Sequence, residues 1–475
     1  MHRAATLLTL SSLAALLPAA GPAAASAPTA ELVKDIMPGE DPSLPSGLTV
    51  AGGTLFFRAL DDESGSELWR SDGTAEGTAL VKDIRPGPTP AAPQELTDVN
   101  GMLFFFVYGG AGFELWKSDG TAGGTVLVRA LPGELLGPHP GELTNVDGTL
   151  YFVHDDGASG PELWRSDGTG AGTAMVRDIR MGSEGSSPRE LTAVGGTLYF
   201  AANDGLFGRE LWKSDGTELG TTLVADIALG PATSVPDELT PLAGALYFAA
   251  DDGLRGRELW RSDGTILGTT LVRDVDGLFA GASPSGLTEV GGRLYFAGDL
   301  GQSGYELWRS DGTAAGTTMV RDIRIGGEPS FPRELTDVNG TLYFVADDTA
   351  CFQPAVCQPP TVGVTGAELW RSDGTYDGTV RVADILPGAA GSFPDELTAV
   401  GGRLFLVADD GAIGEELWTS DGTAAGTTLV RDIWLGSRDS FPEHLTALGG
   451  TLLFAANDGL LGRELWRAGE PPPTG

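Results

Sequence analysis

Apolar and polar residues alternate in short blocks along most of this chain, and the blocks recur in a fixed order. Between two flanking loops, one unit contains Leu191–Val194, Leu198–Ala202, Glu210–Lys213 and Leu223–Ile227, separated by turn residues. The blocks are too short for helices and do not show the 3.6-residue period of an amphipathic helix. The pattern predicts four β-strands in each unit, named A, B, C and D in chain order.

The turn between strands A and B is the strongest local signal. In all nine units it is a residue pair with glycine in second place: Gly52-Gly53, Asn100-Gly101, Asp147-Gly148, Gly195-Gly196, Ala243-Gly244, Gly291-Gly292, Asn339-Gly340, Gly401-Gly402 and Gly449-Gly450. All but the Ala-Gly pair are favoured in two-residue hairpins, where both turn residues take positive φ. The units are therefore expected to be antiparallel meanders.

A tryptophan marks each unit and sets the period. The nine residues are Trp69, Trp116, Trp164, Trp212, Trp260, Trp308, Trp370, Trp418 and Trp466. Successive tryptophans are 47 or 48 residues apart, except for one step of 62. A fixed period of this size indicates a repeat architecture. Since strands B, C and D carry apolar residues at adjacent positions, both faces of each sheet are expected to be buried, as in a propeller blade. We expect these tryptophans to lie in the core, so that Trp260→Ala would cost about 3–5 kcal/mol.

The two ends of the repeat array complement each other. Residues 31–36 resemble a strand D that has no A, B or C of its own, whereas the last unit ends soon after Trp466 without a strand D. If residues 31–36 pair with the last repeat, the ring closes and leaves no exposed sheet edge. The sequence therefore predicts an all-β fold: a single β-propeller over residues 28–475, with nine four-stranded blades.

The N-terminus has the pattern of a secretory signal. A weakly basic start precedes the apolar run Ala4–Ala20 and the small-residue run Ala23–Ala27, which offers cleavage sites. We expect residues 1–25 to be a signal peptide and the protein to be secreted or held at the bacterial cell surface. A short membrane anchor is the less favoured alternative. Because no later stretch has about 20 apolar residues, no membrane span is expected.

Composition narrows the classes of partner. The net charge is −35, with 41% hydrophobic and 20% charged residues. This charge opposes binding to nucleic acids and anionic membranes, which need a basic surface. The apolar content is too high for a disordered acidic chain. The excess of acidic residues remains compatible with binding of cations, with binding of basic partners, or with a role in solubility alone.

The repeated motif Glu258–Thr265, which reads ELWRSDGT, resembles that of the bacterial ELWxxDGT-repeat family of secreted proteins. The resemblance covers nearly all of the chain after the signal, although the last unit departs from the motif after Trp466. Membership would imply export and a propeller-like repeat, but no established activity. The turn after strand C is also similar to the Asp-box turn of sialidase propellers, which is structural there.

Recognition is expected on the face formed by the B–C and D–A loops, because these vary in length and content between units. Six glutamates begin strand A and are predicted to surround one mouth of the central channel: Glu95, Glu142, Glu190, Glu238, Glu334 and Glu396. Gly47, Gly286 and His444 interrupt the set. One interpretation is a rim that binds or funnels cations, calcium above all. The other, which the sequence favours, is that each glutamate bonds a neighbouring loop backbone.

Other candidates are weaker. Trp434 begins a D–A loop, where it could stack on a sugar or a partner; burial over the blade edge is the favoured alternative. The serines of the SDGT turns lack a nearby base, and the few histidines fall at different strand positions, so no nucleophile or zinc cluster is expected.

One insertion, at about residues 347–364 of repeat 7, explains the longer step in the period. It contains Cys351 and Cys357, which we expect to form a disulfide in an exported protein.

These features predict a monomeric, non-catalytic scaffold that binds a protein or surface glycan, with calcium as the one ion that could assist. The alternative is an acidic glycan hydrolase or lyase that uses carboxylates at the channel mouth. It is less favoured, because six similar glutamates form no distinct acid and base.

Overall fold

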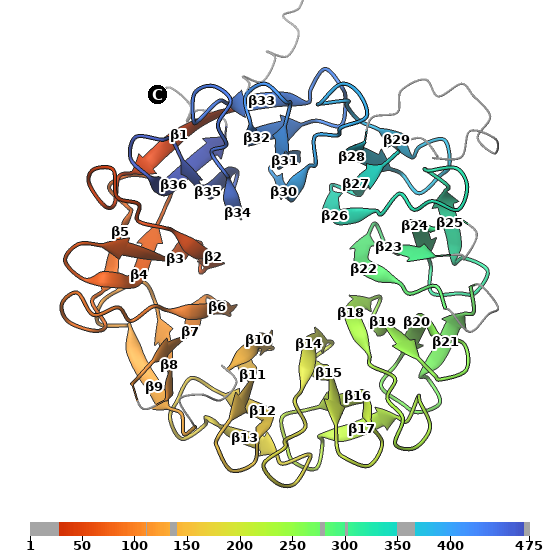
Figure 1. The fold of residues 1–475 in the computed structure, drawn as a ribbon. Helices are drawn as coiled ribbons and strands as arrows, with labels where there is room; N and C mark the ends of the chain where they lie inside the picture. The colour runs from red at the N-terminus through yellow and green to blue at the C-terminus, as the bar shows by residue number, and fades with distance from the viewer. Residues whose placement is uncertain are drawn as a thin grey trace, which may run out of the picture.

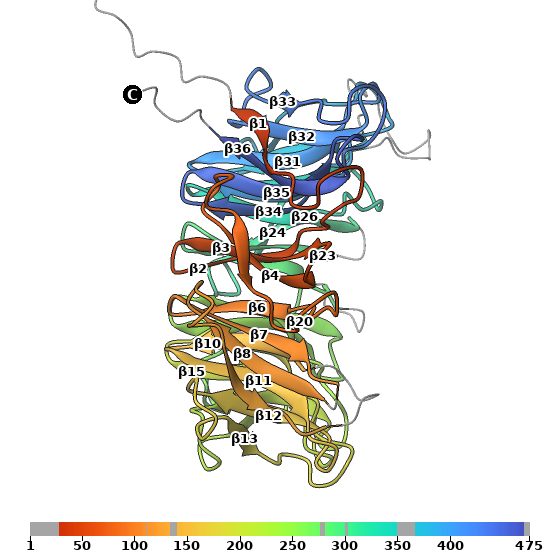
Figure 2. The ribbon, with the colours of Figure 1, turned by 90° about the vertical axis from the view of Figure 1, so that its left-hand side faces the viewer.

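The computed structural model describes residues 28–110, 112–133, 140–275, 281–299, 303–348 and 366–469. These residues form nine four-stranded antiparallel sheets arranged in a ring around a central channel (Figure 1). Figure 2 shows the ring edge-on, as a disc one blade deep. The predicted nine-bladed propeller is confirmed. The predicted signal peptide lies outside the described residues.

Each blade runs from an inner strand A to an outer strand D. The A strands are β2 (Ser46–Ala51), β6 (Gln94–Val99), β10 (Gly141–Val146), β14 (Arg189–Val194), β18 (Asp237–Leu242), β22 (Ser285–Val290), β26 (Arg333–Val338), β30 (Asp395–Val400) and β34 (Glu443–Leu448). The B strands are β3 (Thr54–Asp61), β7 (Met102–Tyr108), β11 (Thr149–Asp155), β15 (Thr197–Asn203), β19 (Ala245–Asp251), β23 (Arg293–Asp299), β27 (Thr341–Asp347), β31 (Arg403–Asp409) and β35 (Thr451–Asn457).

The two outer strands complete each sheet. The C strands are β4 (Gly65–Ser71), β8 (Phe113–Ser118), β12 (Pro161–Ser166), β16 (Arg209–Ser214), β20 (Arg257–Ser262), β24 (Tyr305–Ser310), β28 (Ala367–Ser372), β32 (Glu415–Ser420) and β36 (Arg463–Gly469). The D strands are β5 (Ala79–Lys82), β9 (Val126–Ala130), β13 (Ala174–Arg177), β17 (Thr222–Ala225), β21 (Thr270–Arg273), β25 (Thr318–Arg321), β29 (Val380–Arg381), β33 (Thr428–Arg431) and β1 (Thr29–Lys34). Blade 1 is β2–β5, and the blades are numbered from there along the chain.

Strand β1 closes the ring by completing blade 9. It pairs antiparallel with β36 (Figure 1). In this pairing Leu32 lies opposite Trp466. Ala30 is buried in the cluster between blades 8 and 9, whereas Val33 and Ile36 are buried between blades 9 and 1. The observed strand begins two residues before the predicted 31–36 segment. It ends at Lys34, because Ile36 turns into the loop and donates its N–H to Glu464.

The hydrophobic core is divided into nine layers, one between each pair of neighbouring blades. A typical layer joins Tyr151 and Leu163 of blade 3 to Phe200 and Trp212 of blade 4. Six of the nine repeated tryptophans are almost completely buried in this way; Trp116, Trp260 and Trp418 are partly buried. No blade can bury both of its faces alone, so the ring is the unit that folds.

The A–B turns follow the predicted hairpin geometry. Both turn residues have positive φ in eight of the nine pairs; in the ninth, only Gly449 is in this region. Ala243 has a φ of 49°, although its pair was the one outside the favoured set. Its methyl group makes this left-handed conformation cost roughly 1–2 kcal/mol.

We therefore expect Ala243→Asn to raise the free energy of unfolding by about 0.5–1 kcal/mol, because asparagine tolerates this conformation better. Chemical denaturation measures the change. Asn339→Ala in blade 7, whose φ is 53° at the same position, is the reverse control and should lower stability. If Ala243→Asn did not raise the free energy of unfolding, or if Asn339→Ala did not lower it, the turn at Ala243 would not be strained.

Because the strands alternate in direction, the connections of each blade fall on two faces. The A–B and C–D turns form one, called the turn face. The B–C turns and D–A loops form the other, called the loop face. Hydrogen bonds join the two kinds of connection across the loop face: the N–H of Asn203, at the end of β15, donates to the D–A residue Ser186 at 3.0 Å.

Candidate functional site

The channel rim on the loop face is built from a β-bulge in every A strand. In β14 the pairing shifts between Arg189 and Thr192, which leaves Glu190 and Leu191 without partners in their own sheet. All nine residues at the position of Glu190 have positive φ: Gly47, Glu95, Glu142, Glu190, Glu238, Gly286, Glu334, Glu396 and His444. The glycines at two of these places are explained by this conformation, which glycine adopts without strain.

At four of the bulges, the backbone groups that the bulge frees are bound by the preceding blade. In blade 6, Leu287 donates its N–H to Glu238 Oε2 at 3.1 Å, and its carbonyl accepts from the Thr240 hydroxyl at 3.2 Å. The same pair of bonds recurs from Glu142, Glu334 and Glu396. These glutamates join neighbouring blades, as the favoured interpretation of the sequence expected.

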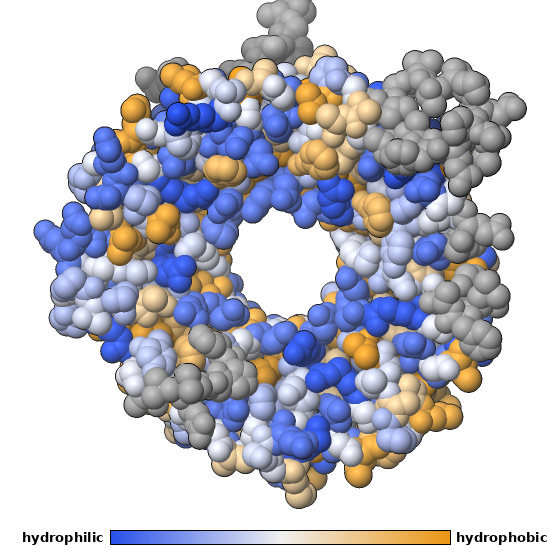
Figure 3. All heavy atoms as spheres, in the orientation of Figure 1, coloured by the Kyte–Doolittle hydropathy of each residue, from blue (hydrophilic) through white to orange (hydrophobic). Residues whose placement is uncertain are grey.

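The rim is hydrophilic (Figure 3). Burial raises the pKa of Glu142 and Glu334, and in Glu334 the nearby charge of Asp395 adds to the effect. Within the described ranges, no group of three or more His, Cys, Asp or Glu side chains could hold a metal ion. The rim glutamates are distributed one to a blade, so the structure does not bring them together as a calcium site.

A second glutamate, in the ELW motif, organises the D–A loops. Glu210 is completely buried and accepts the N–H groups of Ile227, Ala228 and Ser234 at 2.9–3.3 Å, together with the Ser234 hydroxyl at 2.6 Å. Related bonds are made by Glu67, Glu162, Glu306, Glu368, Glu416 and Glu464. Sequence reasoning missed this role, although a charged residue between buried strand positions in every unit was the available signal.

Burial controls the ionisation of these glutamates. It raises the pKa of Glu67, Glu210, Glu306 and Glu464 from 4.5 to about 7, partly offset by the hydrogen bonds they accept. The opposite shift occurs in the exposed C–D turns, where the Thr74 hydroxyl and N–H lower the pKa of Asp72. Asp119, Asp167, Asp215, Asp263, Asp311, Asp373 and Asp421 are lowered by the same bonds.

These opposite shifts predict a stability maximum in mildly acidic solution. The stability linked to the buried glutamates is fully present below their unfolded pKa of 4.5 and is lost as the pH rises through about 7. The stability linked to the turn aspartates is present above 3.8 and is lost as the pH falls through their lower folded pKa. We expect the melting temperature at pH 5 to exceed that at pH 8 by roughly 5 °C.

Thermal melts across pH 3–9 measure this profile, and a melting temperature that rises steadily from pH 5 to 8 would contradict it.

The substitution Glu210→Gln tests the contribution of a single buried glutamate to stability. The substitution places an amide N–H₂ against backbone donors, so we expect it to lower the free energy of unfolding by about 2–4 kcal/mol. Glu218→Gln, an exposed substitution on the turn face of the same blade, is the matched control and should change little.

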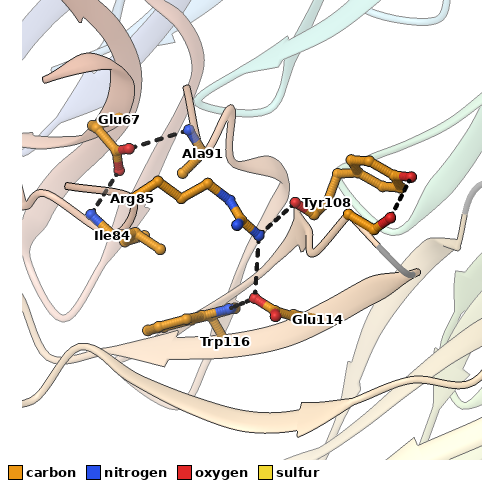
Figure 4. A network of polar contacts seen from close by, with 8 residues as sticks. Glu67, Ile84, Arg85, Ala91, Tyr108, Glu114 and Trp116 are labelled. Carbon is orange, nitrogen blue, oxygen red and sulfur yellow. Dashed lines mark hydrogen bonds and ion pairs between the residues drawn. The ribbon is translucent and has the colours of Figure 1, made fainter. Parts of the chain in front are cut away.

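Blade 2 departs from this arrangement. Glu114, the ELW glutamate of this blade, accepts the Trp116 indole N–H at 3.0 Å and lies 3.7 Å from Arg85 (Figure 4). Arg85 also donates to the Tyr108 carbonyl at 2.6 Å, while Glu67 of blade 1 holds its D–A loop in the usual way. Glu114 and the residues around Leu131 line a pocket of about 420 Å³.

A second pocket, of about 450 Å³, lies on the loop face between blades 7 and 9. Phe393 and Phe441, from successive D–A loops, form its apolar walls. Its polar lining comes from Arg333, Asp395, Glu396, Glu415 and Glu443. Of the six glutamates predicted as site residues, only Glu396 lines this pocket. We take the pocket as the candidate binding site and call it the mouth pocket.

The phenylalanines of the mouth pocket are held in an unusual conformation. Phe331, Phe393 and Phe441 precede a proline in three successive D–A loops; each has a φ of 46–47° and is 44–63% exposed. The N–H of Phe393 is fixed by the Ala367 carbonyl at 3.1 Å. Phe331 stacks on Tyr305 at a centroid distance of 6.3 Å. The same position before a proline has a φ of 44–51° in five other D–A loops, at Leu44, Ala92, Ser187, Val235 and Ser283, so this conformation belongs to the repeat. Blades 7, 8 and 9 differ from the others in placing an exposed aromatic ring there, which can stack on a ligand.

Trp434 lies elsewhere. It begins the D–A loop at the outer edge of blade 8, whereas Phe441 ends the same loop near the channel. Trp434 is half-buried, with Arg438 over its ring, and it covers the B–C turn of blade 9 so closely that a Cβ on Gly459 would lie 2.3 Å from its Nε1. This placement agrees with the alternative of burial over the blade edge.

The polar side chains of the SDGT turns form their hydrogen bonds within the turn itself. Ser214 bonds the Thr221 hydroxyl at 2.8 Å and accepts the Gly216 N–H at 3.0 Å, while Asp215 accepts from Thr217. The same bonds recur in all eight turns, so these serines support the chain reversal.

The two described histidines lie in different blades and do not form a common site. His154 is buried beside the Pro132 carbonyl in blade 3, and His444 lies on the rim in blade 9. The expected disulfide between Cys351 and Cys357 and the 349–365 part of the insertion lie outside the described residues.

No family model and no curated protein matches the chain. Among solved structures it is similar to a puromycin hydrolase, with 15% identity, a TM-score of 0.39 and coverage of 89% of this chain and 60% of that one. A structure from a study of two prolyl endopeptidases has 11% identity and a TM-score of 0.42, and covers 79% and 54%. The chain thus spans less than two thirds of these proteins. The similarity is distant and concerns the propeller fold alone.

Proposed function

We propose that this protein is an exported, non-catalytic scaffold that binds a partner protein or a surface glycan through its loop face. The observation that carries the proposal is the uneven distribution of exposed large apolar side chains. Of the 19 among the described residues, 13 lie on the loop face: Leu44, Met181, Leu206, Phe207, Leu229, Val235, Leu254, Ile325, Phe331, Phe393, Leu435, Phe441 and Leu460. Apolar groups gathered on one face of a rigid scaffold are typical of an interaction surface.

The differences between blades support the same face. The turn face repeats one hydrogen-bonded C–D turn eight times, whereas the D–A loops differ in sequence from blade to blade. Buried glutamates hold these loops from beneath, so their side chains can vary while the backbone stays in place. A rigid frame with variable loops is the common design of binding proteins.

The other parts of the proposal rest on the sequence. We infer membership of the ELWxxDGT-repeat family from the repeated motif, secretion or cell-surface attachment from the expected signal peptide, and a monomeric state. The part of the chain that the structure describes contains no helix that could span a membrane. The acidic glycan-active enzyme is the weaker proposal, because four of the six rim glutamates already bind the backbone of the next blade.

A glycan array and a panel of purified cell-surface proteins test the proposal. We expect at least one of them to bind the wild-type protein. Binding should weaken at least tenfold when Leu229, Ile325 and Leu435, exposed on the loop face, are changed together to serine. The matched control changes Leu219 and Leu267, which are 92% and 90% exposed on the turn face, to serine. No binding, or binding sensitive only to the control, would contradict the proposal.

A further inference from the structure

The blades differ at one pair of positions on the loop face, where strand A and strand C begin. In blade 9, the Arg463 guanidinium binds the Glu443 carboxylate, with Nη1 2.7 Å from Oε2. In blade 5, Arg257 and Asp237 occupy the same two positions and form an ion pair. At these two blades, an acid that begins strand A is therefore neutralised by an arginine that begins strand C.

Blade 8 lacks this arginine. Its strands β30 and β32 begin with Asp395 and Glu415, so both positions carry a carboxylate. The Glu415 carboxylate has no hydrogen-bond or ion-pair partner within the described ranges. Burial raises the pKa of Glu415, and the charges of Asp439, Asp409 and Asp395 raise it further. The negative charge at this place is therefore incompletely compensated by the protein itself.

The mouth pocket lies directly at this pair of acids. Four carboxylates (Asp395, Glu396, Glu415 and Glu443) line it together with a single cation, Arg333. Arg333 forms no ion pair within 4 Å among the described residues, and Glu443 is already bound to Arg463. Phe393 and Phe441 line the same pocket as Glu415, which stands where blades 5 and 9 have an arginine.

We propose that the mouth pocket binds the guanidinium group of an arginine side chain from a partner polypeptide, in the place that Arg257 and Arg463 occupy in blades 5 and 9. The planar guanidinium can donate two parallel hydrogen bonds to a carboxylate while its face stacks on an aromatic ring. The inference rests on the proposed function, since it names a partner class for the loop face.

The lining selects among cations. A divalent metal ion would keep a hydration shell that the phenylalanine walls cannot bind, and among the described residues no group of three or more acidic, histidine or cysteine side chains is arranged to hold one. An ammonium group is more strongly hydrated than a guanidinium and lacks its planar face. An arginine next to apolar residues matches both the acids and the walls, and its charge complements the net −35 of the chain.

The tripeptide acetyl-Leu-Arg-Leu-amide is a suitable probe, measured by calorimetry and NMR titration at pH 7.5 and low salt. The citrulline peptide, which keeps the shape but loses the charge, is its matched control. The lysine peptide and free agmatine separate a polypeptide arginine from other cations. We expect the arginine peptide to bind at least tenfold more tightly than the citrulline peptide and measurably more tightly than lysine or agmatine.

Two variants connect binding to the site. Glu415→Arg recreates the internal ion pair of blades 5 and 9, so it should abolish peptide binding and raise the melting temperature. Phe393→Ala keeps the acids but removes a wall, and should weaken binding at least fivefold without losing the preference for arginine over citrulline. Glu218→Gln, an exposed acid on the turn face, should bind as the wild type does.

Three results would overturn the inference: no measurable binding of the arginine peptide, equal binding of the citrulline peptide, or unchanged binding by Glu415→Arg. A glycan that binds at the mouth pocket and is displaced by no peptide would also overturn it. In that case the proposed function would stand, because the triple serine variant on the outer loops tests the loop face independently.

Discussion

A chain that lacks residues 28–36 should lose cooperative folding, or melt far below the intact ring. These residues include β1, whose Leu32 lies opposite Trp466, and they bury Val33 and Ile36 between blades 9 and 1. Burial of three large aliphatic side chains contributes about 5 kcal/mol, before the strand's hydrogen bonds are counted. That amount is comparable to the whole stability of many domains.

The loss should be visible as an exposed edge. Without β1, strand β36 presents unpaired backbone groups and Glu464 loses the N–H of Ile36, so we expect aggregation and binding of a hydrophobic dye. A chain that begins at residue 28 and keeps β1 is the matched control. A synthetic peptide of residues 28–38 should restore the transition when added to the truncated chain. A truncated chain that melts like the control would show that the ring does not depend on this strand.

Trp308→Ala should lower the free energy of unfolding by about 3–5 kcal/mol through lost burial and a cavity. Trp308 is 2% exposed, packs between blades 5 and 6, and donates its indole N–H to the Gly298 carbonyl at 3.1 Å. The substitution therefore leaves a buried acceptor without its partner as well as a void. Chemical denaturation followed by circular dichroism measures the change.

Two other tryptophans, which are less buried than Trp308, show whether the loss of stability follows burial. Trp260 occupies the same repeat position but is only partly buried, so Trp260→Ala should cost less than Trp308→Ala, at the low end of the range expected from sequence. Trp434→Ala, outside the repeat, should cost the least of the three. If the three variants lost equal stability, burial between blades would not be the source of the effect.

The architecture could be predicted from sequence because its signals are local and repeated nine times. Asn-Gly and Gly-Gly pairs determine the hairpins, adjacent apolar residues such as Tyr199 and Phe200 require two buried faces, and the period requires a ring or a solenoid. The orphan strand near Leu32 decided between these. Each signal depends on a few neighbouring residues, so a one-dimensional pattern is enough to detect it.

The candidate site could be predicted only in part. The glutamates of strand A were placed correctly at the rim, but their bonds to the next blade depend on a bulge that no single unit reveals. The alternation of glycine with glutamate at Gly47 and Gly286 was the available sign of positive φ. The mouth pocket was missed, because Phe393, Glu415 and Phe441 are separated in sequence and line one pocket only in the folded ring.

The sequence by itself determined the strand order, the number of blades, the closure of the ring and the separation of a constant face from a variable one. Only the tertiary structure decided which carboxylates join neighbouring blades and which, such as Asp395 and Glu415, gather in a pocket whose lining contains one cation, Arg333. The physical reason is the separation along the chain of the residues that interact. Turn geometry and strand pairing act between residues close in the chain or repeated at a fixed spacing, whereas the charge balance of a pocket depends on side chains that several loops bring together.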